Sequence, residues 1–111
     1  MKQKTFSARQ GDIWIEEVKL VPNSAKPVDK AGKDRIILAL GEVTHHHHSL
    51  DIAAADWWKD DTSGDQFLTV NTKTSVTHQE HGAIVLAPKK TYRVIRQREY
   101  VPKQLPRQVA D

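Results

Sequence analysis

Short apolar runs, each ended by glycine, proline or asparagine, are the feature that most constrains how this chain can fold. Their residues alternate in polarity or are rich in β-branched types, and none of them shows the 3.6-residue period of an amphipathic helix. The expected strands are 11–20, 35–40, 42–50, 66–71, 75–78, 83–86 and 91–101. We therefore predict an all-β protein, built as a small antiparallel β-barrel or sandwich.

One of these runs, Arg35–Leu40, is apolar without alternation. This pattern is typical of a strand buried on both faces, although periodicity alone also permits a short helix. Between the runs, Ser24–Asp34 has the composition of a surface loop. Asp51–Gly64 is a polar segment, and its Ala-Ala-Ala-Asp-Trp-Trp sequence can form a helical turn.

The length of 111 residues suits one domain, which we place at 1–111 with extended or flexible tails at 1–9 and 102–111. The hydrophobic share of 38% is lean for a short chain, so a bound metal or a homo-oligomer interface would help to stabilise it. The N-terminus lacks the apolar stretch of a signal peptide, and no run reaches the roughly 18 apolar residues of a membrane span. We expect a cytoplasmic protein without membrane association.

Positive charge gathers late in the chain, which has a net charge of +3. The basic residues concerned are Lys89, Lys90, Arg93, Arg96, Arg98, Lys103 and Arg107. Such a cluster can contact phosphates, but the aromatic residues are too few and too scattered to stack on bases. We interpret the region as a solvated basic strand and tail, and we do not expect a nucleic-acid partner.

Four consecutive histidines, His45–His48, are interpreted as native, because purification tags are placed at termini and both flanks read as strand. Alternate side chains of a strand share a face, so His46 and His48 project together while His45 and His47 face the other way. Two imidazoles on one face can chelate one metal ion. The chain has no cysteine, so any metal must be held by nitrogen and oxygen atoms.

A second pair, His78 and His81, follows a short strand. A bend at Glu80–Gly82 would turn both side chains inward, and strand ends often become neighbours in antiparallel folds. We predict a transition-metal site, zinc first, with His46, His48, His78 and His81 as ligands. The alternative is that each histidine is only exposed or satisfied within the core.

Three histidines with an open fourth position would make a bound water acidic enough to react near neutral pH. We therefore predict a metalloenzyme acting on a small-molecule substrate, with carbonic anhydrase-type lyase chemistry as the simplest case and a hydrolase as the next. Glu80 is the candidate catalytic proton acceptor or orienting partner, and equally a surface carboxylate. Glu42 shares the face of His46 and His48 and is an alternative ligand.

The competing prediction is a non-catalytic, metal-stabilised module that binds a protein partner. It would dock through Trp57, Trp58 or the basic last strand. The two tryptophans lie in a polar segment, and we favour the alternative that this segment folds them onto the edge of its own sheet. Gln97–Tyr100 offers donors, acceptors and a phenol, which suit a structural polar network or a substrate pocket, and we favour the network.

Four motifs together resemble a family of short bacterial and phage proteins with QGD, GEVTGHxH, HEEHxPI and QREY signatures. The segments that carry the resemblance are Gln10–Asp12, Gly41–His48, His78–His81 and Gln97–Tyr100. The resemblance puts His46, His48, His78 and His81 at the family's histidine positions, whereas His45 stands where glycine is usual and His47 where a small residue is usual. It implies no particular activity. The His-x-His pair is similar to that of cupins in architecture only.

Overall fold

The computed structural model describes residues 6–40 and 46–97, which contain ten strands and no helix. The strands are β1 (Ser7–Gln10), β2 (Ile13–Val18), β3 (Ala25–Pro27), β4 (Arg35–Leu40), β5 (His47–Asp51), β6 (Ala55–Asp60), β7 (Gln66–Val70), β8 (Thr74–Val76), β9 (Ile84–Leu86) and β10 (Thr91–Arg96). The described residues accordingly include no helix that is long and apolar enough to cross a membrane.

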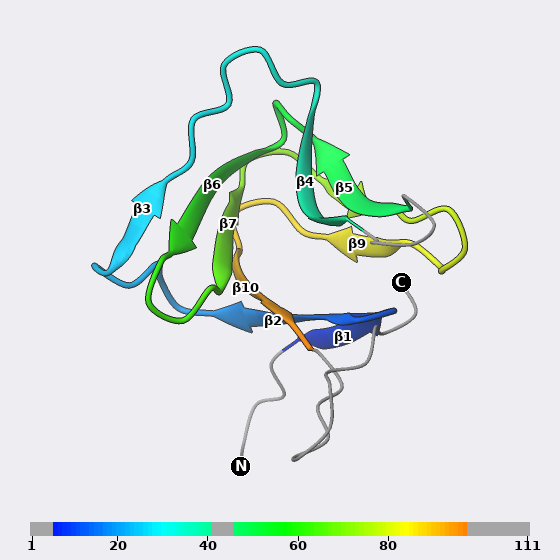
Figure 1. Cartoon of the computed structure of the whole chain (residues 1–111), viewed down its shortest axis with the longest axis horizontal. Helices are drawn as coiled ribbons and strands as arrows, with labels where there is room; N and C mark the ends of the chain where they lie inside the picture. Colours follow the sequence, from blue (N-terminus) through cyan, green and yellow to red (C-terminus); the bar gives the residue numbers. More distant parts are fainter. Residues whose placement is uncertain (1–5, 41–45, 98–111) are drawn as a thin grey trace, which may run out of the picture.

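The main sheet has six strands in the order β1-β2-β10-β7-β6-β3, and the β4–β5 and β8–β9 hairpins form two smaller sheets. Neighbouring strands pair antiparallel throughout these sheets. In Figure 1 the large sheet curves from β3 round to β1, and β4, β5 and β9 lie on the other side of the core. The arrangement is sandwich-like, and the predicted all-β antiparallel fold is confirmed.

The core sits between these layers and draws on both. In β2, Ile13 and Ile15 are fully buried, as expected for alternate residues on the inner face of a strand. From β4 and β5, Ile36 and Leu50 meet them in the same cluster. The buried set also includes Leu38, Ala39, Ala55, Leu68, Val70, Val76, Ile84, Leu86, Tyr92 and Val94.

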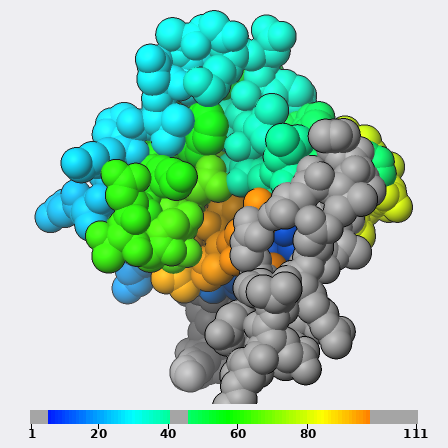
Figure 2. Space-filling view, viewed as in Figure 1, coloured from blue at the N-terminus to red at the C-terminus, as the bar shows by residue number. Residues whose placement is uncertain are grey.

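Both edges of the main sheet differ from the prediction. Ser7–Gln10 forms β1, although residues 7–9 had the polar composition of a tail. Ala25–Pro27 forms β3 within the predicted loop. Polar residues and proline are tolerated in such strands because an edge strand needs partners on one side only. The polar sequences of β1 and β3 therefore did not predict strands, because these strands form by pairing with their neighbours. The chain between β3 and β4 projects at one end of the molecule, as Figure 2 shows.

The segment Ala55–Asp60, where we expected a polar loop with a helical turn, is strand β6. Trp57 and Trp58 are successive strand residues, so they point to opposite faces and do not make one aromatic patch. Trp57 packs against the core, and its indole Nε1–H donates to Oε1 of Gln66 at 2.8 Å. Docking of a partner through Trp57 or Trp58 stays a prediction, and it would involve one indole and not a shared patch of both.

Strand β4 is not buried on both faces. Ile37 and Leu40 are 44% and 50% exposed, while Ile36 is fully buried. The register with β5 shifts between Ile37 and Ala39, which is the mark of a β-bulge. Strand β4 is therefore an apolar strand with one exposed face, and the prediction of a strand buried on both faces is wrong.

Candidate metal centre

The site is organised by a single antiparallel bridge between Ser49 of β5 and Thr77, which follows β8. The Ser49 N–H donates to Thr77 O at 3.1 Å, and the Thr77 N–H donates to Ser49 O at 2.8 Å. Antiparallel register then sets His48 opposite His78 and His46 opposite Glu80. The backbone N–H of His47 donates to Oε1 of Gln79 at 2.9 Å and extends the contact.

The four histidines of the sequence prediction come together at this junction. We name His46, His48, His78 and His81 the histidine cluster. The ring centroid of His78 lies 4.5 Å from that of His48, 4.6 Å from that of His81 and 5.4 Å from that of His46. The His48 and His81 rings are parallel at 6.5 Å. His48 and His78 are buried, whereas His46 and His81 are half-buried, so the cluster reaches from the core to the surface.

His48 is fixed by a buried glutamine. The Nε2 atom of Gln10 donates to the carbonyl oxygens of Val76 and Gly82, at 3.0 and 2.8 Å. Its Oε1 atom therefore faces Nδ1 of His48, at 2.8 Å. Because an amide oxygen only accepts, Nδ1 carries the proton.

The other ring nitrogen, Nε2 of His48, lies 3.0 Å from Oδ1 of Asp12. Asp12 is 1% exposed, and its Oδ2 accepts from Nε of Arg96 at 2.8 Å. Burial lowers the pKa of His48 to about 4, and the neighbouring His78 adds to this effect while Asp12 opposes it. The lowered pKa favours the neutral ring, which is the form of histidine that binds metal ions.

His46 has a similar partner on the outer side of the cluster. Its Nδ1 lies 2.7 Å from Oε1 of Glu80, whose side chain is 59% exposed. A neutral His46 ring with its proton on Nδ1, the nitrogen beside this carboxylate, would have its lone pair on Nε2. A carboxylate on the second nitrogen is the usual way in which proteins orient a metal-binding histidine.

His78 is engaged differently. Its Nδ1 accepts from the backbone N–H groups of Glu80 and His81, at 3.0 and 3.3 Å. The lone pair of Nδ1 is used in this turn, so a neutral ring carries its proton on Nε2. His78 thus shapes the bend that brings His81 inward, and it could bind a metal only after releasing these two bonds.

Over residues 6–40 and 46–97, no three His, Asp or Glu side chains are placed so that they could hold one metal ion. The rings touch without their nitrogen atoms converging on a point, and ligation by the histidine cluster stays a prediction. Two of the other candidates, Glu42 and His45, lie outside the described residues, as do Arg98, Glu99 and Tyr100.

Sequence reasoning did not single out Gln10, Asp12 or Arg96 as contacts of the cluster. They approach it from β1, from the turn after β1, and from β10, because the β1–β2–β10 ladder aligns these positions. The signal in the sequence is the Gln10–Asp12 motif, which carries the family resemblance but by itself indicates no chemistry.

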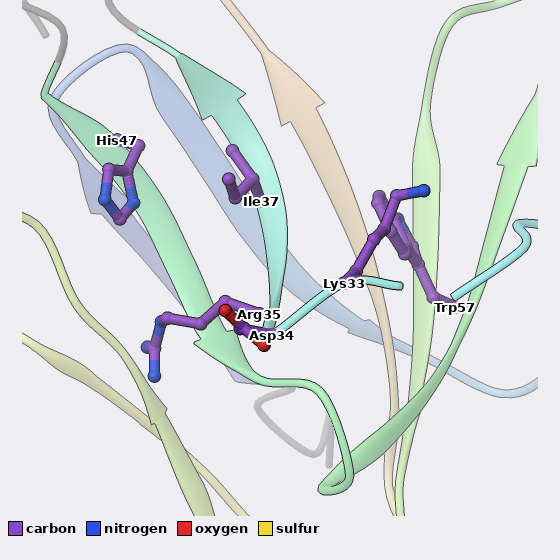
Figure 3. Close-up of a pocket in the computed structure, with 6 residues that line it drawn as sticks. All are labelled: Lys33, Asp34, Arg35, Ile37, His47 and Trp57. Carbon is purple, nitrogen blue, oxygen red and sulfur yellow. The ribbon is translucent and has the colours of Figure 1, made fainter. Parts of the chain in front are cut away.

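His47 belongs to a different place. With Lys33, Asp34, Arg35, Ile37 and Trp57 it lines a pocket of about 320 Å³. Figure 3 shows His47 and Ile37 on one side of this pocket and Lys33 and Trp57 on the other. The Nδ1 atom of His47 lies 3.0 Å from Oγ of Ser49, which also accepts from Nε of Arg35 at 2.8 Å. His47 is therefore a natural control for experiments on His46 and His48.

The basic strand β10 is partly neutralised by its neighbours. Arg93 pairs with Glu16 at 2.7 Å and Arg96 with Asp12, while Lys90, just before the strand, lies 3.4 Å from Glu17. These contacts pair basic residues of β10 and of the turn before it with acidic residues of β2 and of the turn that precedes it. Among the described residues, the strand does not present these cations as an unbroken phosphate-binding row.

Comparison with known proteins relates this chain to one protein family. No curated protein and no solved structure shows significant similarity to this chain. A family model described as a domain of unknown function, DUF8820, matches residues 9–97, which include Gln10, Asp12 and all of the histidine cluster. The chain belongs to this family.

Proposed function

We propose that this protein binds a divalent transition metal ion, with zinc as the first candidate, through the histidine cluster. The observation that carries the proposal is the matched state of His46 and His48. Each has Nδ1 beside a side-chain oxygen, at 2.7 Å from Glu80 and 2.8 Å from Gln10, and the Gln10 contact leaves Nε2 as the donor nitrogen of His48. A His-x-His pair prepared in this way suits chelation.

His81 and His78 are the further ligands of the proposal. His81 is half-buried beside His78, so a change of rotamer can turn it towards His48. His78 must first give up its bonds to the Glu80 and His81 backbone. We therefore expect His46 and His48 to contribute most of the affinity, and the bend at residues 78–82 to rearrange when metal binds.

The reaction proposed for this site is hydration or hydrolysis of a small substrate in the cytoplasm, with carbon dioxide hydration as the simplest case. A metal ion on a histidine set with an open position supplies an acidified water. Within this chain, Glu80 would orient His46, since its carboxylate already contacts the ring. If the contact with His46 opens, Glu80 could instead act as the proton acceptor that the sequence predicts.

The second candidate is a non-catalytic module in which the cluster only stabilises the fold. The buried state of His48 and the role of His78 in the turn favour this alternative. Closed ligation by four protein atoms would support it, because a catalytic metal needs an open position. The motif set that resembles short bacterial and phage proteins includes Gln10, His46, His48 and His78, and is compatible with both candidates.

The test is metal analysis of untagged protein, followed by titration of the metal-free protein with Zn²⁺. We expect one zinc per chain in the wild type and loss of that zinc in His46→Ala/His48→Ala. The matched control is His45→Ala/His47→Ala, which removes the same number of histidines from the same run. It should retain the metal, since His47 lines the separate pocket.

The control separates a built site from adventitious binding by a histidine run. Equal loss of zinc in both double variants would indicate simple tag-like binding and would overturn the proposal. The absence of any stoichiometric metal in the wild type would do the same. With the site established, assays of carbon dioxide hydration and ester hydrolysis distinguish the enzyme from the structural module.

A further inference from the structure

The buried pair of His48 and Asp12 offers a donor set that the four histidines alone do not. Gln10 fixes the proton of His48 on Nδ1, so Nε2 is the nitrogen that a metal can use. The atom that this nitrogen faces is Oδ1 of Asp12, at 3.0 Å. Resting on the metal-binding function proposed above, we infer that Asp12 is itself a metal ligand and that the site is a mixed histidine–carboxylate centre.

The spacing of the two atoms fits a shared ion. Ligand distances of about 2.1 Å for both nitrogen and oxygen, with 3.0 Å between them, give an angle of about 90° at the metal. This is the angle between adjacent ligands in an octahedral site, whereas tetrahedral ligands would lie about 3.4 Å apart. The pair as it stands therefore favours a five- or six-coordinate ion, and a tetrahedral zinc would require a small separation of the two groups.

The surroundings of Asp12 suit a ligand role. Its side chain is 1% exposed, so solvent does not compete for the carboxylate. Arg96 holds Oδ2 at 2.8 Å and leaves Oδ1 directed at His48. The guanidinium of Arg96 also donates to Leu40 O at 3.0 Å, which anchors it independently of Asp12. A ligating carboxylate is commonly oriented by such a hydrogen bond on its second oxygen.

The inference also suggests the order in which the ligands would assemble. His48 and Asp12 already lie side by side, while the rings of His78 and His81 lie 4.5 and 6.5 Å from that of His48. Binding would start on the preformed pair and then draw in the half-buried His81 or His46. A histidine–carboxylate set of this kind is typical of iron, manganese or zinc centres.

The experiment uses the full chain, with Zn²⁺ and Mn²⁺ as probes and Asp12→Asn as the variant. Asparagine keeps an oxygen for Arg96 and directs its N–H at Nε2 of His48, so the neighbours remain satisfied while the donor oxygen is lost. We expect Zn²⁺ affinity to fall by roughly 100-fold or more. Glu80→Gln, the matched control at an orienting position, should lose only roughly 10- to 100-fold.

A second measurement does not depend on the variant. In wild-type protein with ¹³C-labelled aspartate, the Asp12 carboxyl resonance should shift on addition of one equivalent of Zn²⁺. If Asp12→Asn does not fold, this resonance alone decides the question.

Each result has a definite meaning. A shifted resonance with the large loss of affinity supports Asp12 as a ligand. Stoichiometric zinc binding with an unchanged Asp12 resonance, and an Asp12→Asn affinity within tenfold of the wild type, overturns the inference and leaves the histidine site intact. Failure of the wild type to bind either ion overturns both the inference and the function on which it rests.

Discussion

The Oε1 atom of Gln10 and the Nδ1 atom of His48 lie 2.8 Å apart inside the core, where both side chains are almost completely removed from solvent. Through its Nε2, the same amide also reaches the carbonyl oxygens of Val76 and Gly82. One side chain thus joins three segments of the chain around the histidine cluster. Buried polar groups that lose such partners are costly, which makes this amide a point where stability and site geometry depend on one residue.

The first prediction is that Gln10→Leu lowers the free energy of unfolding by about 2–4 kcal/mol, since it leaves the buried His48 N–H and a buried carbonyl without their partner. Urea unfolding followed by circular dichroism measures the change. Gln66→Leu is the matched control. Gln66 also accepts from one group and donates to another, but it is half-buried. Equal losses in the two variants would contradict a special role for Gln10.

The second prediction concerns the core of the main sheet. Leu68 is fully buried in β7, so Leu68→Ala should lower the free energy of unfolding by about 2–5 kcal/mol. Leu20→Ala makes the same chemical change at a side chain that is 70% exposed, and it should alter stability by less than about 0.5 kcal/mol. Chemical denaturation of both variants provides the comparison, and similar values would show that β7 is not part of the core.

The third prediction concerns the turn between β6 and β7. Gly64 has a φ of +80°, a conformation that disfavours a Cβ atom, although nothing lies within 4 Å of the place that this atom would take. Gly64→Ala should therefore lower stability by about 1 kcal/mol through backbone strain alone. Gly82 has equal space and no positive φ, so Gly82→Ala should stay within about 0.5 kcal/mol of the wild type. Thermal melts of the two variants test this, and equal melting temperatures would contradict it.

The fold was predictable from the sequence where a strand buries one face. Ile13 and Ile15 alternate with polar or half-buried residues, and this period reveals β2 without any tertiary information. Strands β1, β3 and β6 were missed for a different reason. Their residues, such as Arg9, Pro27 and Asp56, have low strand propensity, and the strands form because neighbours pair with them.

The site was predictable only in part. The convergence of His48 and His78 follows from the closeness of strand ends, which sequence spacing suggested. The contacts of His48 with Gln10 and Asp12 span 38 and 36 residues, and they depend on how the β1–β2 ladder faces β5. No local period encodes this relation. The bonds that commit His78 to the turn were equally invisible, because they depend on a ring orientation set by the bend.

The last prediction is a pH dependence of stability in metal-free protein, measured with a chelator present. Burial lowers the pKa of His48 from 6.5 to about 4, so the unfolded chain binds a proton more readily than the folded chain between these values. The stabilisation is complete above pH 6.5 and is lost as the pH falls towards 4. Its size is at most about 3 kcal/mol.

Urea unfolding between pH 7 and pH 4 measures this loss, and the decisive comparison is the slope of stability against pH. His48→Gln should have a shallower slope than the wild type, whereas His47→Gln should retain the wild-type slope because it leaves His48 in place. In parallel, the ring resonances of His48 in the folded wild type should stay at their neutral positions down to about pH 5, because folded His48 protonates only near 4. A resonance that titrates near 6.5 would show that the Asp12 carboxylate outweighs burial at this position, and the wild-type and His48→Gln slopes would then coincide.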